Sequence, residues 1–167
     1  IQIQHQDYWD DQTINNLMAP DEKLIERVAS IEEVTHATRR LESFSLASSE
    51  DITRGSLIIG VDPPNEQEVT GLKKWIIEGE YLQSGDNAVM VASELAKYLK
   101  LGIGDTITLY SMGYHGVTAA GIYPVKGILK FPSPELNKQT VYMPLELCMD
   151  FYGTQGQVTS VVLMIQD

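Results

Sequence analysis

The chain has 167 residues, which is enough for one compact domain or for two small lobes that share a core. Its 12 Lys and Arg residues and 23 Asp and Glu residues give a net charge of −11 at pH 7. Because nucleic acids and anionic membranes are bound by clustered cations, this charge argues against both kinds of partner.

The first residues predict a strand, a loop and a helix. Residues 1–5 alternate apolar and polar side chains, which is the pattern of a half-buried strand. Residues 7–16 are polar and predict a loop whose aromatic side chains, Tyr8 and Trp9, cover the core. A helix then begins with Asp21 as its cap, since apolar side chains recur on one face at spacings of three and four.

A long hairpin is predicted next. Residues 34–48 and 56–61 are rich in Thr, Ser, Ile and Leu, and a polar turn separates them. The consecutive prolines within residues 62–65 stop the second strand, because each proline removes a backbone donor and fixes φ. Residues 66–72 predict a short helix or turn.

The centre of the chain predicts a strand, a helix, a glycine turn and a second strand. The first strand covers residues 88–91, and the helix starts near Ser93. Residues 102–105 form the glycine turn, and residues 106–110 alternate in the manner of a strand. This stretch holds no obvious catalytic group, so we expect it to be a rigid base for the segment that follows.

That segment, residues 111–121, predicts a loop with an exposed tip. It carries three glycines and no Asp, Glu, Lys or Arg, and Met112, Tyr114 and His115 lie among the glycines. Apolar and aromatic groups on an exposed loop often mark a contact surface. We therefore expect Met112, Tyr114 and His115 to bind a partner. The alternative is a hairpin tip that folds back onto the body of the domain.

The end of the chain predicts three strands and a helix. Residues 122–131 predict a strand that a proline interrupts. Residues 140–143 predict a buried strand, residues 145–152 a helix, and residues 158–165 the last strand. If the first and last strands pair in one sheet, the two chain ends lie close together, as an inserted domain requires.

The residues that could carry catalysis or bind a metal lack the partners that such chemistry requires. The three histidines are far apart, and none has a second ligand at metal spacing. Ser93 and Lys97 do not have the S-x-x-K spacing of penicillin-recognising enzymes, so Ser93 is expected to cap a helix and Lys97 to be solvated. Cys148 lies among apolar residues and is expected to be a buried, inert thiol. The sequence therefore predicts a protein that is not an enzyme and has no cofactor.

Several motifs resemble those of MacB-like extracytoplasmic domains, and they occur in the same order. They are Ile1-Gln2-Ile3-Gln4, then Ile59-Gly60-Val61-Asp62-Pro63 with Glu78-Gly79-Glu80-Tyr81-Leu82, then the set Val91, Leu95, Ala96, Leu99, Leu101, Gly104, Asp105, Ile107 and Leu109, then Tyr123-Pro124-Val125-Lys126-Gly127-Ile128, and finally Val141-Tyr142-Met143-Pro144-Leu145. Together they extend over nearly the whole chain.

The resemblance implies an α+β fold with two lobes. A Porter-like lobe built from βαβ units would take both chain ends, residues 1–72 and 131–167. A β-rich, Sabre-like lobe, residues 73–130, would be inserted into it. The domain would lie between the first and second transmembrane helices of an FtsX/MacB/LolC/LolE-type ABC transporter permease, on the periplasmic side of the bacterial inner membrane. We accordingly expect the chain to be a fragment of a longer, multi-pass membrane protein.

The resemblance also implies a function and partners. An ABC ATPase subunit or domain and a second permease protomer are expected to work with the full-length protein. ATP-driven motion would be passed to the domain, which would move a substrate or engage a periplasmic chaperone or adaptor protein, in lipoprotein release or in efflux. In the lipoprotein-releasing branch a long hairpin captures the chaperone. Residues 111–121 correspond to that hairpin but are shorter and lack its proline-rich character.

A free-standing β-barrel-type binding module is the alternative. Turns like that at residues 102–105 also occur in such barrels, where Gly supplies the turn and Asp bonds its backbone. One closed barrel with distant termini would favour this alternative.

Overall fold

The computed structural model describes residues 1–20 and 22–166 and has the α+β fold that the sequence predicts. Its strands are β1 (Gln2–Gln4), β2 (Val34–Ser49), β3 (Ile52–Val61), β4 (Ile76–Gly79), β5 (Val89–Ala92), β6 (Thr106–Met112), β7 (Thr118–Leu129), β8 (Thr140–Pro144) and β9 (Ser160–Ile165). Its helices are α1 (Gln6–Asp10), α2 (Glu22–Ala29), α3 (Pro63–Thr70), α4 (Ser93–Tyr98), α5 (Pro134–Gln139) and α6 (Leu145–Tyr152), with the short 3₁₀ turns η1 (Leu72–Trp75) and η2 (Tyr114–Gly116).

Six of the strands form a closed ring. Going around it, β2 pairs with β3, β3 with β8, β8 with β5, β5 with β7, β7 with β6, and β6 again with β2. The β3–β8 and β5–β7 pairs are parallel, and the other pairs in the ring are antiparallel. The remaining strands extend the sheet, since β9 and then β1 lie beside the first half of β2, and β4 lies beside the end of β7.

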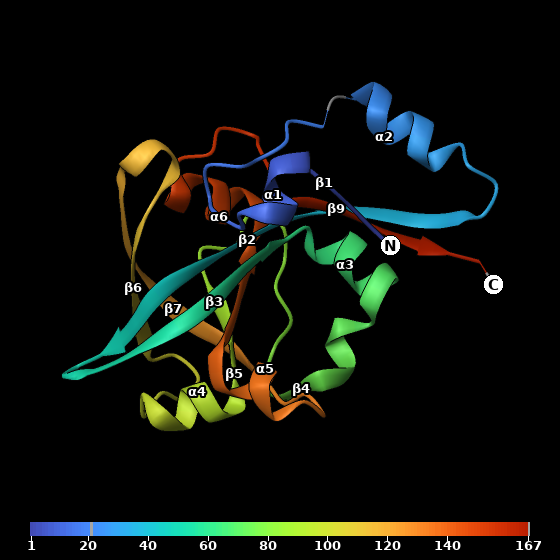
Figure 1. Cartoon of the computed structure of the whole chain (residues 1–167). Helices are drawn as coiled ribbons and strands as arrows, with labels where there is room; N and C mark the ends of the chain where they lie inside the picture. The colour runs from blue at the N-terminus through green and yellow to red at the C-terminus, as the bar shows by residue number, and fades with distance from the viewer. Residues whose placement is uncertain (21, 167) are drawn as a thin grey trace.

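The main hydrophobic core lies inside the ring. All six ring strands contribute buried side chains to one cluster, among them Leu41, Ile58, Val91 and Val141. Because side chains alternate along a strand, every second residue points into this core. Buried side chains of α4 and α6 join the same cluster, and the two helices lie at opposite ends of the ring (Figure 1).

A glycine at position 60 of β3 allows α6 to approach the ring. A Cβ atom at this position would lie 2.5 Å from Cβ and 2.7 Å from Sγ of Cys148. Cys148 is fully buried, as the sequence predicts, and burial raises the pKa of its thiol above the ordinary value of 9.0. The thiol is therefore protonated at neutral pH and serves packing.

Two smaller clusters cover parts of the outside of the ring. In one, Leu72 of η1, together with Leu82 and Phe131, packs on outward-facing side chains such as Ile59 and Tyr142. In the other, Val28 of α2 packs on Val161 and Leu163 of β9. Neither cluster includes the outward-facing side chains of the second half of β2, of β6 or of the first half of β7.

The two ends of the chain lie side by side (Figure 1). The N–H of Leu163 donates to the carbonyl of Ile1 at 2.7 Å, and the terminal amine of Ile1 donates to the carbonyl of Leu163 at 3.2 Å. The first and last strands thus pair in one sheet, and the chain ends lie close together as such a pairing predicts. Among the residues that the structure describes, no helix has the length and apolar character needed to cross a membrane.

Some local predictions are wrong. The segment predicted as a loop at residues 7–16 contains α1, and only one of its aromatic side chains covers the core, since Tyr8 is buried and Trp9 is 77% exposed. Ala92, not Ser93, occupies the position before the first turn of α4, and the Ser93 hydroxyl is buried without capping the helix. The cap predicted at Asp21 lies outside the described residues.

The loop predicted at residues 111–121 is largely strand. β6 continues to Met112 and β7 begins at Thr118, so only a short tip separates them. The inward-facing positions here are Ser111, Gly113, Ala119 and Gly121, which are small and give little hydrophobic signal. The alternation of a strand is therefore hidden in the sequence.

The division into two lobes remains a prediction. One hydrogen-bonded sheet includes strands from both predicted lobes, because β5 pairs with β8 and β6 pairs with β2. The ring is closed, as in the barrel alternative, but its termini are adjacent, which that alternative does not predict.

The close approach of β3 and α6 gives a first test. We expect Gly60→Ala to lower the free energy of unfolding by about 1–3 kcal/mol, because the new methyl group overlaps Cys148. Gly55→Ala is the matched control in the same strand, since a Cβ there meets nothing within 4 Å. Urea unfolding followed by circular dichroism measures both, and equal stabilities of the two variants would contradict this account of the packing.

Candidate functional site

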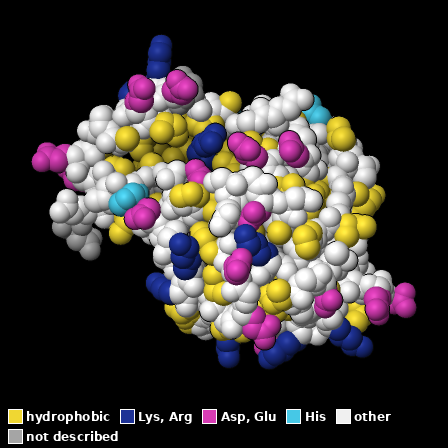
Figure 2. Space-filling view, turned by 180° about the vertical axis from the view of Figure 1, so that it is seen from behind, with side chains coloured by type: hydrophobic (Ala, Val, Ile, Leu, Met, Phe, Trp, Pro, Cys, Tyr) yellow, Lys and Arg dark blue, Asp and Glu magenta, His cyan; other side chains and the backbone are white. Residues whose placement is uncertain are grey.

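An uncovered, apolar surface lies on the outside of the ring, over β2, β6 and β7. We call it the outer wall and define it by five exposed side chains. They are Phe44 (64% exposed), Leu46 (50%), Tyr110 (54%), Met112 (70%) and Ile122 (64%). Apolar side chains on the β6–β7 side of the molecule are visible at the right of Figure 2. Exposed apolar groups gathered in this way are typical of an interaction surface.

Strand register brings these side chains together. Leu46 of β2 lies opposite Tyr110 of β6, and Tyr110 lies opposite Ala120 of β7. Ile122 follows two residues after Ala120 on the same face, opposite Thr108. Directly opposed residues on one face of antiparallel strands have Cβ atoms about 4.5–5.5 Å apart, so the wall is continuous across the three strands.

The outer wall carries no charged side chain. Its outward-facing positions are Phe44, Leu46 and Ser48 on β2, Thr106, Thr108, Tyr110 and Met112 on β6, and Thr118, Ala120, Ile122 and Pro124 on β7. This contrasts with the net charge of −11 of the whole chain. Charged residues are depleted at the centres of protein–protein interfaces, and aromatic residues and Met are enriched there.

The wall is held in position from inside the ring. The Tyr152 hydroxyl of α6 donates to the Phe44 carbonyl at 3.1 Å, and the Ser111 hydroxyl donates to the same carbonyl at 2.8 Å. At the tip of the β6–β7 hairpin, a Cβ on Gly113 would lie 2.5 Å from the Tyr152 carbonyl. The backbone of the wall is therefore fixed to α6.

The three residues predicted to bind a partner have different surroundings. Met112 belongs to the outer wall, whereas Tyr114 is partly buried and packs against the main core. His115 is exposed, its backbone N–H donates to the Asn15 side chain at 2.9 Å, and its ring lies 3.9 Å from that of Tyr114. The tip thus folds back in part, as the alternative interpretation predicted.

Sequence reasoning missed the other residues of the wall. Phe44 and Leu46 alternate with Ser45 and Ala47, which face inward and are small. In a strand with this pattern the large apolar side chains would be assigned to the core. The observation that fixes which face of β2 is the outer one is the hydrogen bond from the Ser45 hydroxyl to the carbonyl of Tyr110 on β6. Only the structure provides this contact.

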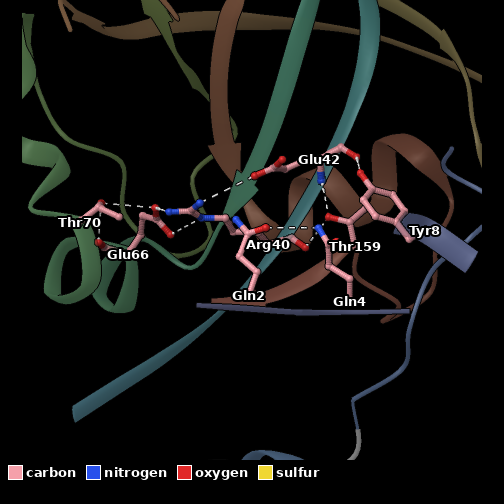
Figure 3. Close-up of polar contacts among 8 residues, drawn as sticks. All are labelled: Gln2, Gln4, Tyr8, Arg40, Glu42, Glu66, Thr70 and Thr159. Carbon is pink, nitrogen blue, oxygen red and sulfur yellow. Dashed lines mark hydrogen bonds and ion pairs between the residues drawn. The ribbon is translucent and has the colours of Figure 1, made fainter. Parts of the chain in front are cut away.

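A buried polar network connects β2 to the elements around the chain ends (Figure 3). Arg40 Nε donates to Glu66 Oε2 of α3 at 3.1 Å, and its Nη2 donates to Glu66 Oε1. The Glu66 side chain is only 1% exposed, and the Thr70 hydroxyl lies 3.4 Å from it. Burial lowers the pKa of Arg40, but the hydrogen bonds and charge of Glu66 outweigh this and raise it.

The same part of β2 is bonded to the start of β9 and to α1. The Arg40 carbonyl accepts hydrogen bonds from the Thr159 N–H and hydroxyl, both at 3.0 Å. The Thr159 hydroxyl in turn accepts from the Glu42 N–H at 2.9 Å, and the Tyr8 hydroxyl approaches the Glu42 carbonyl at 3.5 Å. Two elements near the termini, α1 and the start of β9, are therefore bonded to the Arg40–Glu42 segment of β2.

The side chains considered for catalysis or metal binding are separated. Lys97 Nζ bonds Glu94 Oε1 at 3.2 Å rather than Ser93, and it is solvent-exposed as predicted. His36 lies 3.8 Å from Glu68, and His5 lies 3.7 Å from Asp7. Within residues 1–20 and 22–166 no group of three His, Cys, Asp or Glu residues has metal-binding geometry.

Comparison with protein families gives a match over the whole chain. The family model described as the MacB-like periplasmic core domain matches residues 1–167. A sequence search of curated proteins found no match.

Solved structures have the same fold. The chain is similar to the extracellular domain of the noncanonical ABC-type transporter YknZ from Gram-positive bacteria, with a TM-score of 0.66 and 16% identity, over 90% of this chain and 74% of that one. It is also similar to the periplasmic region of MacB from Actinobacillus actinomycetemcomitans (TM-score 0.61, 13% identity, 85% of this chain and 63% of that one). A domain of a putative permease from Porphyromonas gingivalis is similar too (TM-score 0.58, 14% identity, 90% of this chain and 63% of that one).

The buried ion pair predicts a large effect of a single substitution. We expect Glu66→Ala to lower the free energy of unfolding by about 3–5 kcal/mol, because the Arg40 guanidinium, 15% exposed, loses its two hydrogen bonds to Glu66 and keeps only the longer contact with Glu42 at 3.8 Å. Glu68→Ala, on the same helix and 63% exposed, is the control and should change stability by less than about 0.5 kcal/mol. The double variant Arg40→Met, Glu66→Leu should recover most of the loss. A Glu66→Ala protein as stable as the Glu68→Ala protein would contradict the role of the pair.

Glu42 predicts a dependence of stability on pH. Burial raises the pKa of Glu42 above its ordinary value of 4.5, and Arg40, which lowers it, offsets this only in part. Since the folded state holds the proton more tightly than the unfolded state, the penalty for the charged carboxylate is full above the folded pKa. This penalty disappears as the pH falls through the folded-state pKa of Glu42 towards 4.5.

We therefore expect Glu42→Gln to raise the melting temperature at pH 7.5 and to lose this advantage near pH 4.5. Glu135→Gln, on exposed α5, makes the same change of charge and should show no such difference. Thermal unfolding at both pH values tests this, and an advantage of Glu42→Gln that does not vary with pH would count against it.

Proposed function

The chain belongs to the family of MacB-like periplasmic core domains, and we propose that it is a non-catalytic part of an ABC transporter permease that transmits ATP-driven motion to an extracytoplasmic partner protein. The observation that carries the proposal is the outer wall, an uncharged apolar surface built on a rigid ring whose chain ends are adjacent. Residues that could support catalysis lie apart, which agrees with a role in binding and movement.

The position of the termini supports the transmission of motion. Ile1 and Leu163 are hydrogen-bonded to each other, so the two ends of the domain lie at essentially the same position. β9, which contains Leu163, pairs with the first half of β2, and the second half of β2 forms part of the outer wall. A displacement of the chain ends would therefore move the wall together with the ring, because closed sheets and packed cores do not deform gradually.

The partner that fits the outer wall is a protein with an uncharged, partly apolar surface of its own. The candidate partners in this family are a periplasmic adaptor or chaperone, a second permease protomer and an ATPase. An ATPase acts on the other side of the membrane, and two domains of charge −11 repel each other. We therefore assign the wall to an adaptor or chaperone, with Met112 as one contact and with His115 at its border.

A free-standing binding module is a second candidate function, and one observation favours it. The six ring strands close completely, as they would in a barrel-type module. The adjacent termini and the family match over residues 1–167 favour the permease. A full-length sequence without membrane helices on both sides of the domain would leave only the binding module.

The outer wall can be tested by placing a charge on it. We expect Leu46→Asp and Met112→Asp each to weaken binding of the purified domain to its periplasmic adaptor or chaperone by at least about tenfold, because each buries a carboxylate at an apolar contact. Isothermal titration calorimetry measures the affinity. Ile77→Asp, on β4 and away from the wall, starts from a side chain whose exposure (55%) lies between those of Leu46 and Met112, and it should bind normally.

Two results would overturn this assignment. If Ile77→Asp weakens binding as much as Met112→Asp, the effect comes from charge alone and the wall is not the contact. If sedimentation shows a dimer of the domain that Met112→Asp dissociates, the wall binds a second copy. In the full-length permease the wall variants should retain basal ATP hydrolysis, since the proposal assigns these residues to partner binding and not to the ATPase.

A further inference from the structure

A second site lies apart from the outer wall, at the free edge of β2. β9 pairs with residues 34–40 of β2 on one side, but β3 pairs with β2 only from Arg40 onwards. Beyond Val61 the chain leaves the sheet to form α3. On this side no strand of the described chain pairs with residues 34–39.

Backbone hydrogen-bonding groups of Ala37 and Arg39 point to this free side. Ala37 lies opposite Leu163, and Leu163 uses both its N–H and its carbonyl to bond Ile1 of β1. In an antiparallel pair, bonded and non-bonded residues alternate, so it is Thr38 that bonds β9. Ala37 and Arg39 therefore direct their N–H and carbonyl groups away from β9, as the edge of a sheet does.

A groove runs along this edge. A cavity of about 420 Å³ is lined by Ala37, Thr38 and Arg39 of β2, by Asp62 and Asn65 at the start of α3, and by Pro20, Glu22, Ile25 and Glu26 at α2. A second cavity of about 120 Å³ shares Arg39 and Asp62 with it and extends to Glu146 of α6. Figure 2 shows the hollow at the upper left, below α2, with apolar side chains at its floor.

The groove is acidic and contains an unsatisfied polar group. Glu22, Glu26, Asp62 and Glu146 line it, against the single cation Arg39. The Thr38 side chain is 3% exposed, and its hydroxyl has no hydrogen-bond partner in the described part of the chain. Ser93, Thr140 and Thr154 also have buried hydroxyls that lack a partner in the described part of the chain, so the free edge and the charge of the groove, rather than Thr38, indicate a ligand.

We propose that the free edge of β2 at residues 37–39 binds an extended, basic peptide segment of a partner protein as an added strand. Main-chain hydrogen bonds to Ala37 and Arg39 would hold the segment in register. Its alternate side chains would meet the apolar floor at Ile25, and its Lys or Arg side chains would meet the carboxylates of the groove. A second copy of this acidic chain is a poor occupant, because its net charge has the wrong sign.

The probe is a fluorescein-labelled peptide of alternating Lys and Val, seven residues long, titrated with the purified domain and followed by fluorescence anisotropy. Two matched peptides separate the contributions. One replaces each Lys by Glu, and the other keeps Lys but carries N-methyl groups on alternate backbone nitrogens. We expect both replacements to weaken binding by at least about tenfold, the first through charge and the second through loss of edge hydrogen bonds.

Variants of the domain locate the site. Ala37→Pro removes an N–H that the fold does not use, so it should weaken the Lys–Val peptide by about tenfold and leave the melting temperature nearly unchanged. Glu26→Gln should weaken it by about two- to fivefold at low salt, whereas Glu135→Gln, remote from the groove, should not. In hydrogen exchange, the amides of Ala37 and Arg39 should become protected on binding, while that of Thr38 is protected throughout.

The outcomes decide the proposal even if one variant fails to fold. Equal binding of the N-methylated peptide would exclude an added strand, and equal binding of the Glu peptide would exclude charge recognition. Protection elsewhere, with Ala37 and Arg39 unchanged, would exclude this groove. A domain dimer lost in Ala37→Pro would make the occupant a second copy. None of these results bears on the outer wall, which the Met112→Asp variant tests separately.

Discussion

The guanidinium of Arg40 lies between β2 and α3, and the arrangement of the outer elements depends on it. Glu66 is almost fully removed from solvent, so its charge is tolerable only because Arg40 bonds it through two nitrogens. The bond fixes α3 to the sheet where β3 ends. The carbonyl of the same residue accepts hydrogen bonds from the N–H and the hydroxyl of Thr159. Arg40 therefore positions both α3 and the start of β9.

Local patterns allowed much of the fold to be predicted. The β2–β3 hairpin follows from two β-rich runs around a polar turn, and the order of β5, α4 and β6 follows from periodicity and glycine. The turn at Gly102 also matches expectation, since its N–H bonds Asp105 Oδ2 at 2.8 Å. These turn and periodicity patterns involve residues that are close together in the sequence, which is why the sequence alone shows them.

Features that depend on distant residues could not be predicted. Ring closure requires β6 to pair with β2, and no sequence pattern states which strands become neighbours. Arg40 and Glu66 are 26 residues apart and meet only after α3 packs. Of the predicted contact residues, Met112 lies on the outer wall, but Phe44 and Leu46 were missed because small inward-facing residues conceal which face of β2 is buried.

The pairing of β1 has a consequence for biosynthesis. Among the described strands β1 pairs only with β9, so the residues at the start of this domain have no strand partner until almost the whole domain has been synthesised. The β2–β3 hairpin can form early, whereas closing the β1–β9 pair joins segments about as far apart in sequence as the chain allows, which slows folding. The ends of the domain are thus the last part to become ordered, because β1 and β9 can pair only after β9 has emerged.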